Sequence, residues 1–241
     1  DQTKPNNRGR FIRPSTLGKL LFGPHGRDPY LEEPGTLWLL HWNLASAPSG
    51  PTTWFWTFNH LNDAEFTKDR LVAALGDLAE QYEWSRIADN SLQRDVDVFI
   101  RTYVSPRTTK TVVLEDSLDC PLAELGLIQE LDDGRLYALY RAERPTLSVD
   151  VFAHAVLAFW RSWTPTRQSL GFEELAYRPG SPGRVFQLSE DALVDYFERL
   201  DGCTGGALVY DVTAGLRQLY RRRDVEPLDV LKGKPAGARA C

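Results

Sequence analysis

Methionine is absent from this chain of 241 residues, which begins at Asp1, and cysteine occurs only three times. Because the usual start residue is missing, we expect a fragment whose natural beginning has been removed. The cysteines at positions 120, 203 and 241 are odd in number and lack zinc-like spacing, so neither a disulfide framework nor a zinc finger is expected. This cysteine usage suits the reducing cytoplasm, where we expect the protein to act.

Common catalytic and targeting motifs are missing too. The sequence has no GxxxxGKS or GxxxxGKT phosphate loop, no GxSxG nucleophile elbow, no HExxH zinc motif and no CxxC pair. It therefore predicts no nucleotide cofactor. It also contains no signal peptide and no apolar run long enough to cross a bilayer, so we expect no membrane association.

An excess of basic residues is also lacking, since the formal net charge is −5. With 42% hydrophobic and 25% charged residues, the composition is that of an ordinary globular protein that can bury a proper core. The acidic balance excludes a surface coated in positive charge. Any contact with DNA must therefore come from a local basic patch.

A helix is predicted at residues 34 to 46, within the stretch DPYLEEPGTLWLLHWNL (28 to 44). Pro34 suits the first helical turn because its φ is fixed and its missing N–H would be unpaired there, and Glu33 before it favours the positive end of the helix dipole. Leucine and tryptophan occur in nearly every direction around this helix. We expect it to be the most buried helix of the chain, with His41 hydrogen-bonded in the core.

Two more helices are predicted from caps and apolar spacing. Thr67 can cap a helix to about residue 81, and Ser91 can cap the next, which carries a continuous apolar stripe. A dense aromatic cluster precedes both helices and could either stack nucleobases or fill the core, of which we favour the core. The stripe consists of Leu92, Val96, Phe99, Ile100 and Tyr103, and the cluster of Trp54, Phe55, Trp56 and Phe58.

Charged residues on the helix of residues 92 to 104 divide into two groups. Arg94, Asp97 and Arg101 lie opposite the apolar stripe, where Asp97 can form exposed ion pairs with either arginine. Asp95 lies at the edge of the stripe, where a carboxylate is expected to need a specific partner.

The second half of the chain repeats a pattern of helices followed by a hairpin. A helix from Pro121, a turn at 132 to 134 and a strand at 136 to 141 resemble the recognition helix and wing of a winged helix. The order then recurs with helices at 148 to 162, 171 to 177 and 190 to 200, a strand at 184 to 186, and a hairpin of 207 to 210 with 216 to 220.

We therefore predict a mainly α fold with small β-hairpins (α+β), in which winged-helix-like modules pack around a buried apolar helix. Residues 1 to 23 are expected to be the hinge of a missing N-terminal module, and residues 233 to 241 a disordered tail. A central helical domain spans residues 24 to 145, and a C-terminal winged-helix-like domain spans residues 146 to 232.

The most basic part of the chain, which includes Arg221, Arg222 and Arg223, directly follows the second predicted wing. Clustered arginines at such places would neutralise DNA phosphates, whereas a solvated surface is the alternative. The candidate DNA-binding residues are Arg94, Arg101, Arg217, Arg221, Arg222 and Arg223.

Several segments together are similar to a bacterial family, the SspB-like proteins, long labelled as of unknown function and encoded beside DNA-phosphorothioation genes. The resemblance implies DNA nicking in that system, a missing N-terminal DNA-binding-like segment, and three partners besides DNA: a cysteine desulfurase, an ATPase and a PAPS-reductase-like sulfurtransferase. The matching segments are DPYLEEPGTLWLLHW (28 to 42), TWFWTFN (53 to 59), RDVDVFIRTYV (94 to 104), EDSLDCPLAELGLI (115 to 128), SPGRVFQLSEDAL (181 to 193) and YDVTAGLRQL (210 to 219).

A nickase normally holds Mg²⁺ or Mn²⁺ with carboxylates, so that water attacks a phosphodiester whose charge is neutralised. The candidate catalytic residues are Asp95, Asp97, Glu115 and Asp116. Carboxylates also suit structural roles such as the ion pairs open to Asp97, and Asp95 is the exception to be tested first. Two alternatives stay open: a non-catalytic scaffold that recruits the sulfur-transfer enzymes to DNA, and a protein-binding winged-helix adaptor. The metal ligands and the oligomeric state do not follow from the sequence.

Overall fold

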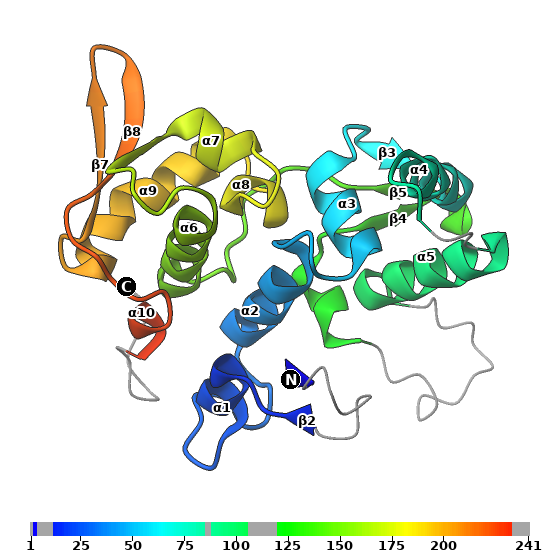
Figure 1. The fold of residues 1–241 in the computed structure, drawn as a ribbon, viewed down its shortest axis with the longest axis horizontal. Helices are drawn as coiled ribbons and strands as arrows, with labels where there is room; N and C mark the ends of the chain where they lie inside the picture. Colours follow the sequence, from blue (N-terminus) through cyan, green and yellow to red (C-terminus); the bar gives the residue numbers. More distant parts are fainter. Residues whose placement is uncertain (1, 4–11, 85–87, 106–119, 233–241) are drawn as a thin grey trace.

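The structure, a computed structural model, describes residues 2–3, 12–84, 88–105 and 120–232. Helices dominate and small antiparallel sheets complete the molecule, so the predicted α+β class is confirmed. Figure 1 shows two lobes side by side, with helix α2 (Pro34–Ala45) below and between them. None of the helices within the described ranges has both the length and the apolar character needed to cross a membrane. The predicted tail at 233 to 241 lies outside the described residues.

The first part of the chain leads into α2. Strands β1 (Gln2–Thr3) and β2 (Ile12–Arg13) pair antiparallel, and α1 (Thr16–Phe22) follows. The side chain of Ser15 accepts a hydrogen bond from the Gly18 N–H and so caps α1. Helix α2 begins at Pro34, one residue after Glu33, as the sequence predicts.

The first lobe, which we name the N-module, comprises residues 52 to 138. Its last strand pairs with both others, so the sheet order is β3-β5-β4. Its elements are α3 (Thr52–His60), β3 (Glu65–Phe66), α4 (Lys68–Gln81), α5 (Asp89–Tyr103), the 3₁₀ helices η2 (Pro121–Leu125) and η3 (Asp132–Gly134), and the strands β4 (Gln129–Leu131) and β5 (Leu136–Ala138).

The second lobe, the C-module, comprises residues 149 to 223, and its sheet order is β6-β8-β7. Both modules therefore run helix, strand, helices and hairpin, with the first strand paired to the last. A short helix, α10 (Asp229–Lys232), follows the hairpin and packs against α6. The elements of the C-module are α6 (Val149–Trp163), β6 (Ser169–Gly171), α7 (Phe172–Tyr177), α8 (Pro182–Val185), α9 (Glu190–Thr204), β7 (Leu208–Thr213) and β8 (Leu216–Arg221).

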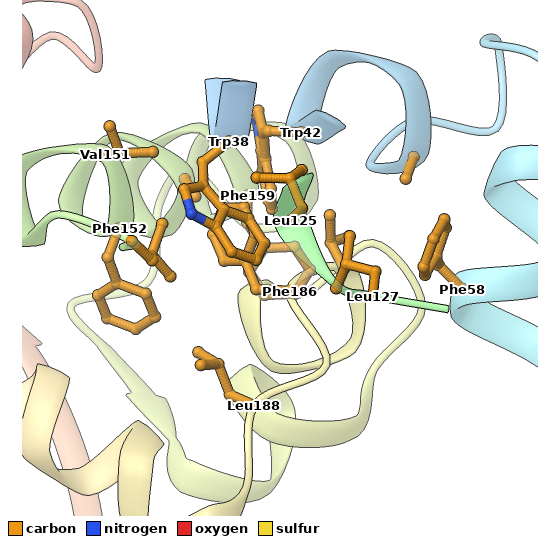
Figure 2. Close-up of a cluster of buried hydrophobic side chains, with 14 of the residues drawn as sticks. Trp38, Trp42, Phe58, Leu125, Leu127, Val151, Phe152, Phe159, Phe186 and Leu188 are labelled. Atoms are coloured by element: carbon orange, nitrogen blue, oxygen red, sulfur yellow. The ribbon is translucent and has the colours of Figure 1, made fainter. Parts of the chain in front are cut away.

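One apolar core extends from α2 into both modules. Figure 2 shows Trp38 and Trp42 of α2 beside Phe186, with Phe152 of the C-module on one side and Phe58 of the N-module on the other. The Phe186 ring lies 5.6 Å from the Trp38 ring and 5.4 Å from the Trp42 ring, between centroids. Aromatic pairs at such separations add to the free energy of area burial, so the two modules are joined by packing as well as by the chain.

Polar bonds cross the same junction. The buried ring of His41 lies 2.7 Å from the Tyr103 hydroxyl of α5 through Nδ1 and 2.7 Å from the Val185 carbonyl of α8 through Nε2. Asn59 of α3 accepts a 2.7 Å bond from the Gly180 N–H. At Gly180, φ is +82° and a Cβ would lie 2.8 Å from a backbone oxygen, so only glycine fits this approach. The core histidine expected from the sequence therefore connects the two modules.

Three predictions about elements were wrong. Helix α6, with nine consecutive buried residues from Val149 to Leu157, is more completely buried than α2, in which Leu40 is only half-buried. Residues 184 to 186 do not form a strand, because Ser181 caps a short helix there and Pro182 occupies its first position. Helix α5 begins at Asp89, so Ser91 lies inside the helix instead of capping it.

Candidate nucleic-acid interface

Four of the predicted site residues lie on the solvent-accessible part of α5. Val96, Phe99, Ile100 and Tyr103 are buried, as their helical spacing predicts. The remaining faces therefore point outward, and each side chain there is at least partly accessible. Arg94, Asp95 and Arg101 are exposed, and Asp97 is partly exposed.

Asp97 forms its ion pair with a neighbouring helix instead of with Arg94 or Arg101. The Lys68 Nζ at the start of α4 lies 2.7 Å from an Asp97 carboxylate oxygen, and this hydrogen bond raises the pKa of Lys68. Arg101 donates through Nε to the Asp97 backbone carbonyl at 3.2 Å. Sequence reasoning missed Lys68, whose position after the Thr67 cap signals only a helix start. We name the solvent-facing surface of α5 and the neighbouring Lys68 the α5 face. Arg94, Asp97 and Arg101 lie on the side of this face next to Lys68, whereas Asp95 lies on the side away from Asp97.

Asp95 does not need the structural partner expected for it. The helix turns this side chain into solvent, where a carboxylate keeps its hydration without a protein partner. Exposure thus removes the physical reason to expect a structural partner, and a ligand as the partner of Asp95 stays a prediction.

The arginines at the end of the C-module hairpin have different environments. Arg221 donates to the Pro165 and Arg167 carbonyls and is largely buried against Trp160. Arg223 donates to the carbonyls of Thr204 and Gly205, at the C-terminal end of α9, where a cation also suits the helix dipole. Both side chains are thus used within the module.

Two other predicted DNA contacts remain at the surface of the C-module. Arg222 is exposed. Arg217 lies over the Phe172 ring, 3.6 Å from its centroid, with carboxylate oxygens of Glu173 and Glu190 at 3.9 and 3.7 Å. The nearby carboxylates already offset the charge of Arg217, so Arg222 is the better placed of the two to meet a phosphate.

Helix α9, the last helix before the C-module hairpin, has an acidic solvent side. Its only basic residue is Arg199, which stacks over the Tyr196 ring. This face repels phosphates, so the C-module is unsuited to contact DNA through the helix that a winged helix normally inserts in the groove. The exposed carboxylates are Glu190, Asp191, Asp195, Glu198 and Asp201.

A divalent metal does not fit the residues that the structure describes. Within the described ranges, no group of three or more histidine, cysteine, aspartate or glutamate side chains could hold an ion. Asp95 and Asp97 are two positions apart on one helix and so point in nearly opposite directions. Glu115 and Asp116 lie outside the described residues. The described side chains alone therefore do not form a metal site.

His41 is unsuited to acid–base chemistry at the surface. It is completely buried, and burial lowers its pKa to about 4, so the ring is neutral at physiological pH. Both ring nitrogens are occupied within the core. Its role is to join the modules.

Comparison with known proteins identifies the family of this chain and similar solved structures. A family model described as a protein of unknown function (DUF4007) matches residues 2–233. A magnesium ion-bound crystal structure of SspB is similar with a TM-score of 0.79 and 27% identity, covering 91% of this chain and 67% of that chain. Another SspB crystal structure gives a TM-score of 0.77 and 28% identity over the same shares. Comparison with curated proteins gives no significant match. The chain therefore belongs to the DUF4007 family, the SspB-like family that its sequence motifs resemble.

Proposed function

We propose that this protein is a DNA-binding and DNA-nicking component of a bacterial DNA phosphorothioation system. The observation that carries the proposal is the similarity to SspB over 91% of the chain at a TM-score of 0.79, which supports a place in the Ssp system. The α5 face adds a physical reason. Its exposed Arg94 and Arg101 can neutralise phosphates within a chain whose net charge is negative.

The α5 face also suggests where chemistry would occur. Asp95 is exposed between the two arginines along the helix, where it could hold a metal-bound or attacking water near a phosphate. Similarity to a magnesium ion-bound SspB supports Mg²⁺, with Mn²⁺ as the usual substitute. Asp95 alone is too few ligands, so Glu115 and Asp116, which follow α5 in the sequence, are the natural candidates to complete the set.

Plasmid nicking tests this proposal. Supercoiled plasmid is incubated with the protein and Mg²⁺ or Mn²⁺, and the open-circle product is measured for Asp95→Asn, Glu115→Gln and Asp116→Asn variants. We expect nicking to be lost in all three with folding retained, and to persist in Asp97→Asn, because Asp97 is paired with Lys68. Nicking that survives Asp95→Asn but not Asp97→Asn would move the site to the Lys68 side of the α5 face.

A second function, a non-catalytic DNA-bound scaffold, is favoured by the lack of a metal-holding cluster among the described residues. In that case the chain would recruit a cysteine desulfurase, an ATPase and a PAPS-reductase-like sulfurtransferase to DNA. The acidic surface of α9 favours protein contact and also fits a third function, a winged-helix adaptor that binds proteins alone.

Two measurements separate these functions. A scaffold binds DNA with an affinity that falls steeply as salt rises, yet does not nick plasmid with either metal. An adaptor shows neither nicking nor salt-dependent DNA binding.

A further inference from the structure

The aromatic cluster at residues 54 to 58 is not wholly core. Phe58 is buried and Trp54 packs edge-on against Phe99 of α5, whereas Phe55 and Trp56 line an open groove between α3 and α4. The groove has a volume of about 460 Å³ and continues into a second hollow of about 380 Å³ that shares Trp56 and His60. Phe55 and Trp56 face the groove while Phe58 faces the core because side chains this close in sequence cannot all face one side of a helix.

Two more aromatic side chains extend the wall at the end of α4. Tyr82 is 62% exposed and Trp84 is 41% exposed, and their rings stack with centroids 6.3 Å apart at 29°. Large aromatic side chains left in water beside a groove are typical of protein-binding surfaces, where tyrosine and tryptophan supply much of the binding free energy. We name the surface formed by Phe55, Trp56, Tyr82 and Trp84 the aromatic groove.

The described side chains that line the second hollow include two carboxylates and one cation. The second hollow is lined by Asp63, Asp77 and Arg70, and the Arg70 Nε already lies 4.0 Å from an Asp63 carboxylate oxygen. Asp77 is exposed and adds a carboxylate that this pair does not neutralise. Burial and the nearby Arg184 charge lower the pKa of His60, so that its ring adds no positive charge at neutral pH.

We propose that the aromatic groove binds a segment of a partner protein in which a lysine or arginine lies beside an apolar or aromatic anchor. The anchor fills the hollow against Phe55 and Trp56. The cationic head points to Asp77, and its aliphatic stem lies over the aromatic faces of the groove. This inference does not depend on nicking or on the α5 face.

Charge decides between a protein segment and single-stranded DNA. Aromatic faces alone would also stack nucleobases. However, a strand whose bases enter the groove brings phosphates toward Asp63 and Asp77, and among the described residues of the lining only Arg70 carries a counter-charge. A basic peptide meets the same carboxylates with favourable charge, so the lining favours the peptide.

The test uses the full chain labelled with ¹⁵N at tryptophan, and assigns the indole signals of Trp56 and Trp84 by tryptophan-to-phenylalanine substitution. The probes are four short ligands: a Gly/Ser peptide with a central Trp-Arg pair, the same peptide with Trp-Glu, the same with Ala-Arg, and a thymidine oligonucleotide. We expect the Trp-Arg peptide to shift both indole signals, and the other peptides to bind at least about three- to tenfold more weakly.

Matched variants on α4 sharpen the test. Asp77→Asn should weaken Trp-Arg binding by about three- to tenfold, whereas Glu80→Gln, an exposed carboxylate on the same helix outside the groove lining, should leave it unchanged. Tyr82→Ala should also weaken binding, with Tyr30→Ala as the control for loss of an exposed tyrosine elsewhere. The proposal would be overturned if the Trp-Glu peptide bound as tightly as the Trp-Arg peptide, or if the oligonucleotide displaced the Trp-Arg peptide. It would also be overturned if no peptide shifted the indole signals of Trp56 and Trp84.

Discussion

The two modules share an order of elements but present different helices to solvent. In each, the first strand pairs with the last strand of a hairpin, and a long helix precedes that hairpin. Helix α5 of the N-module exposes arginines and aspartates together, whereas α9 of the C-module exposes mainly carboxylates. A shared topology therefore does not imply a shared surface function, because the buried face specifies the fold and leaves the exposed face free to vary.

The largest expected effect tests whether the modules unfold together. Phe99→Ala in α5 and Phe197→Ala in α9 each remove a fully buried ring, which should lower the free energy of unfolding by about 3 to 5 kcal/mol. Because one core joins the modules, we expect urea unfolding to remain a single transition in both variants. A variant in which only part of the signal shifts would show two independent modules.

The next effect concerns His41 at the junction. Its pKa is about 4 in the folded protein against an ordinary value of 6.5, so the unfolded state binds more protons between those pH values. The stability contributed by neutral His41 is therefore lost as pH falls from 6.5 to 4, by about 3 kcal/mol in total. Unfolding measured from pH 7.5 to 4 should show a shallower decline in His41→Gln than in the unmodified protein. Parallel pH profiles would contradict this assignment.

DNA binding should distinguish the two long helices. Replacing Arg94 and Arg101 of α5 with alanine should weaken binding equally for all DNA sequences and reduce the salt slope by about 0.9 for each phosphate that the variant no longer neutralises. Arg199→Ala on acidic α9 serves as the control and should change neither quantity. The proposed difference between the helices fails if the Arg199 variant loses as much affinity as the α5 variant.

The arginine triplet allows a smaller test within the C-module. Arg221→Ala should lower the free energy of unfolding by about 1 to 2 kcal/mol, because its donors hold the Pro165 and Arg167 carbonyls. Arg222→Ala should change stability by less than about 0.5 kcal/mol and act only on DNA affinity. Thermal unfolding of both variants measures the change in stability, and DNA titration measures the change in DNA affinity. The reverse pattern would show that Arg221 is the phosphate contact.

The smallest effect is expected at the Lys68 and Asp97 pair. Each side chain is 39% exposed, so the interaction should contribute about 0 to 1 kcal/mol and weaken as salt rises. A double-mutant cycle with Lys68→Ala and Asp97→Ala measures it directly. A coupling energy well above this range would mean that the pair is structurally important to the N-module.

Sequence patterns correctly predicted helix starts and core positions wherever a short segment of the chain determines them. Pro34 after Glu33 marked the start of α2, Thr67 marked that of α4, and helical spacing identified Phe99 as core. The pairing of strands was harder to predict from the sequence, because β6 has only three residues and becomes a strand by pairing with β8. The predicted division of the chain near residue 145 stays a prediction.

The candidate site was only partly accessible to sequence reasoning. The spacing of Arg94, Asp97 and Arg101 correctly predicted a shared exposed face. It did not reveal Lys68, because the contact between α4 and α5 joins residues 29 positions apart. The arginine triplet was read as one patch, yet Arg221 and Arg223 bond to carbonyls that only the folded chain brings near.

By itself, the sequence determined the α+β class, the helices with clear caps and the family, because these depend on periodicity and on motifs a few residues long. Tertiary structure alone decided that His41 joins the modules, that α6 is more deeply buried than α2, and that Phe55 and Trp56 face a groove. Each of these facts depends on which distant segments cover a given face. That is a property of packing, which the local pattern of residues does not contain.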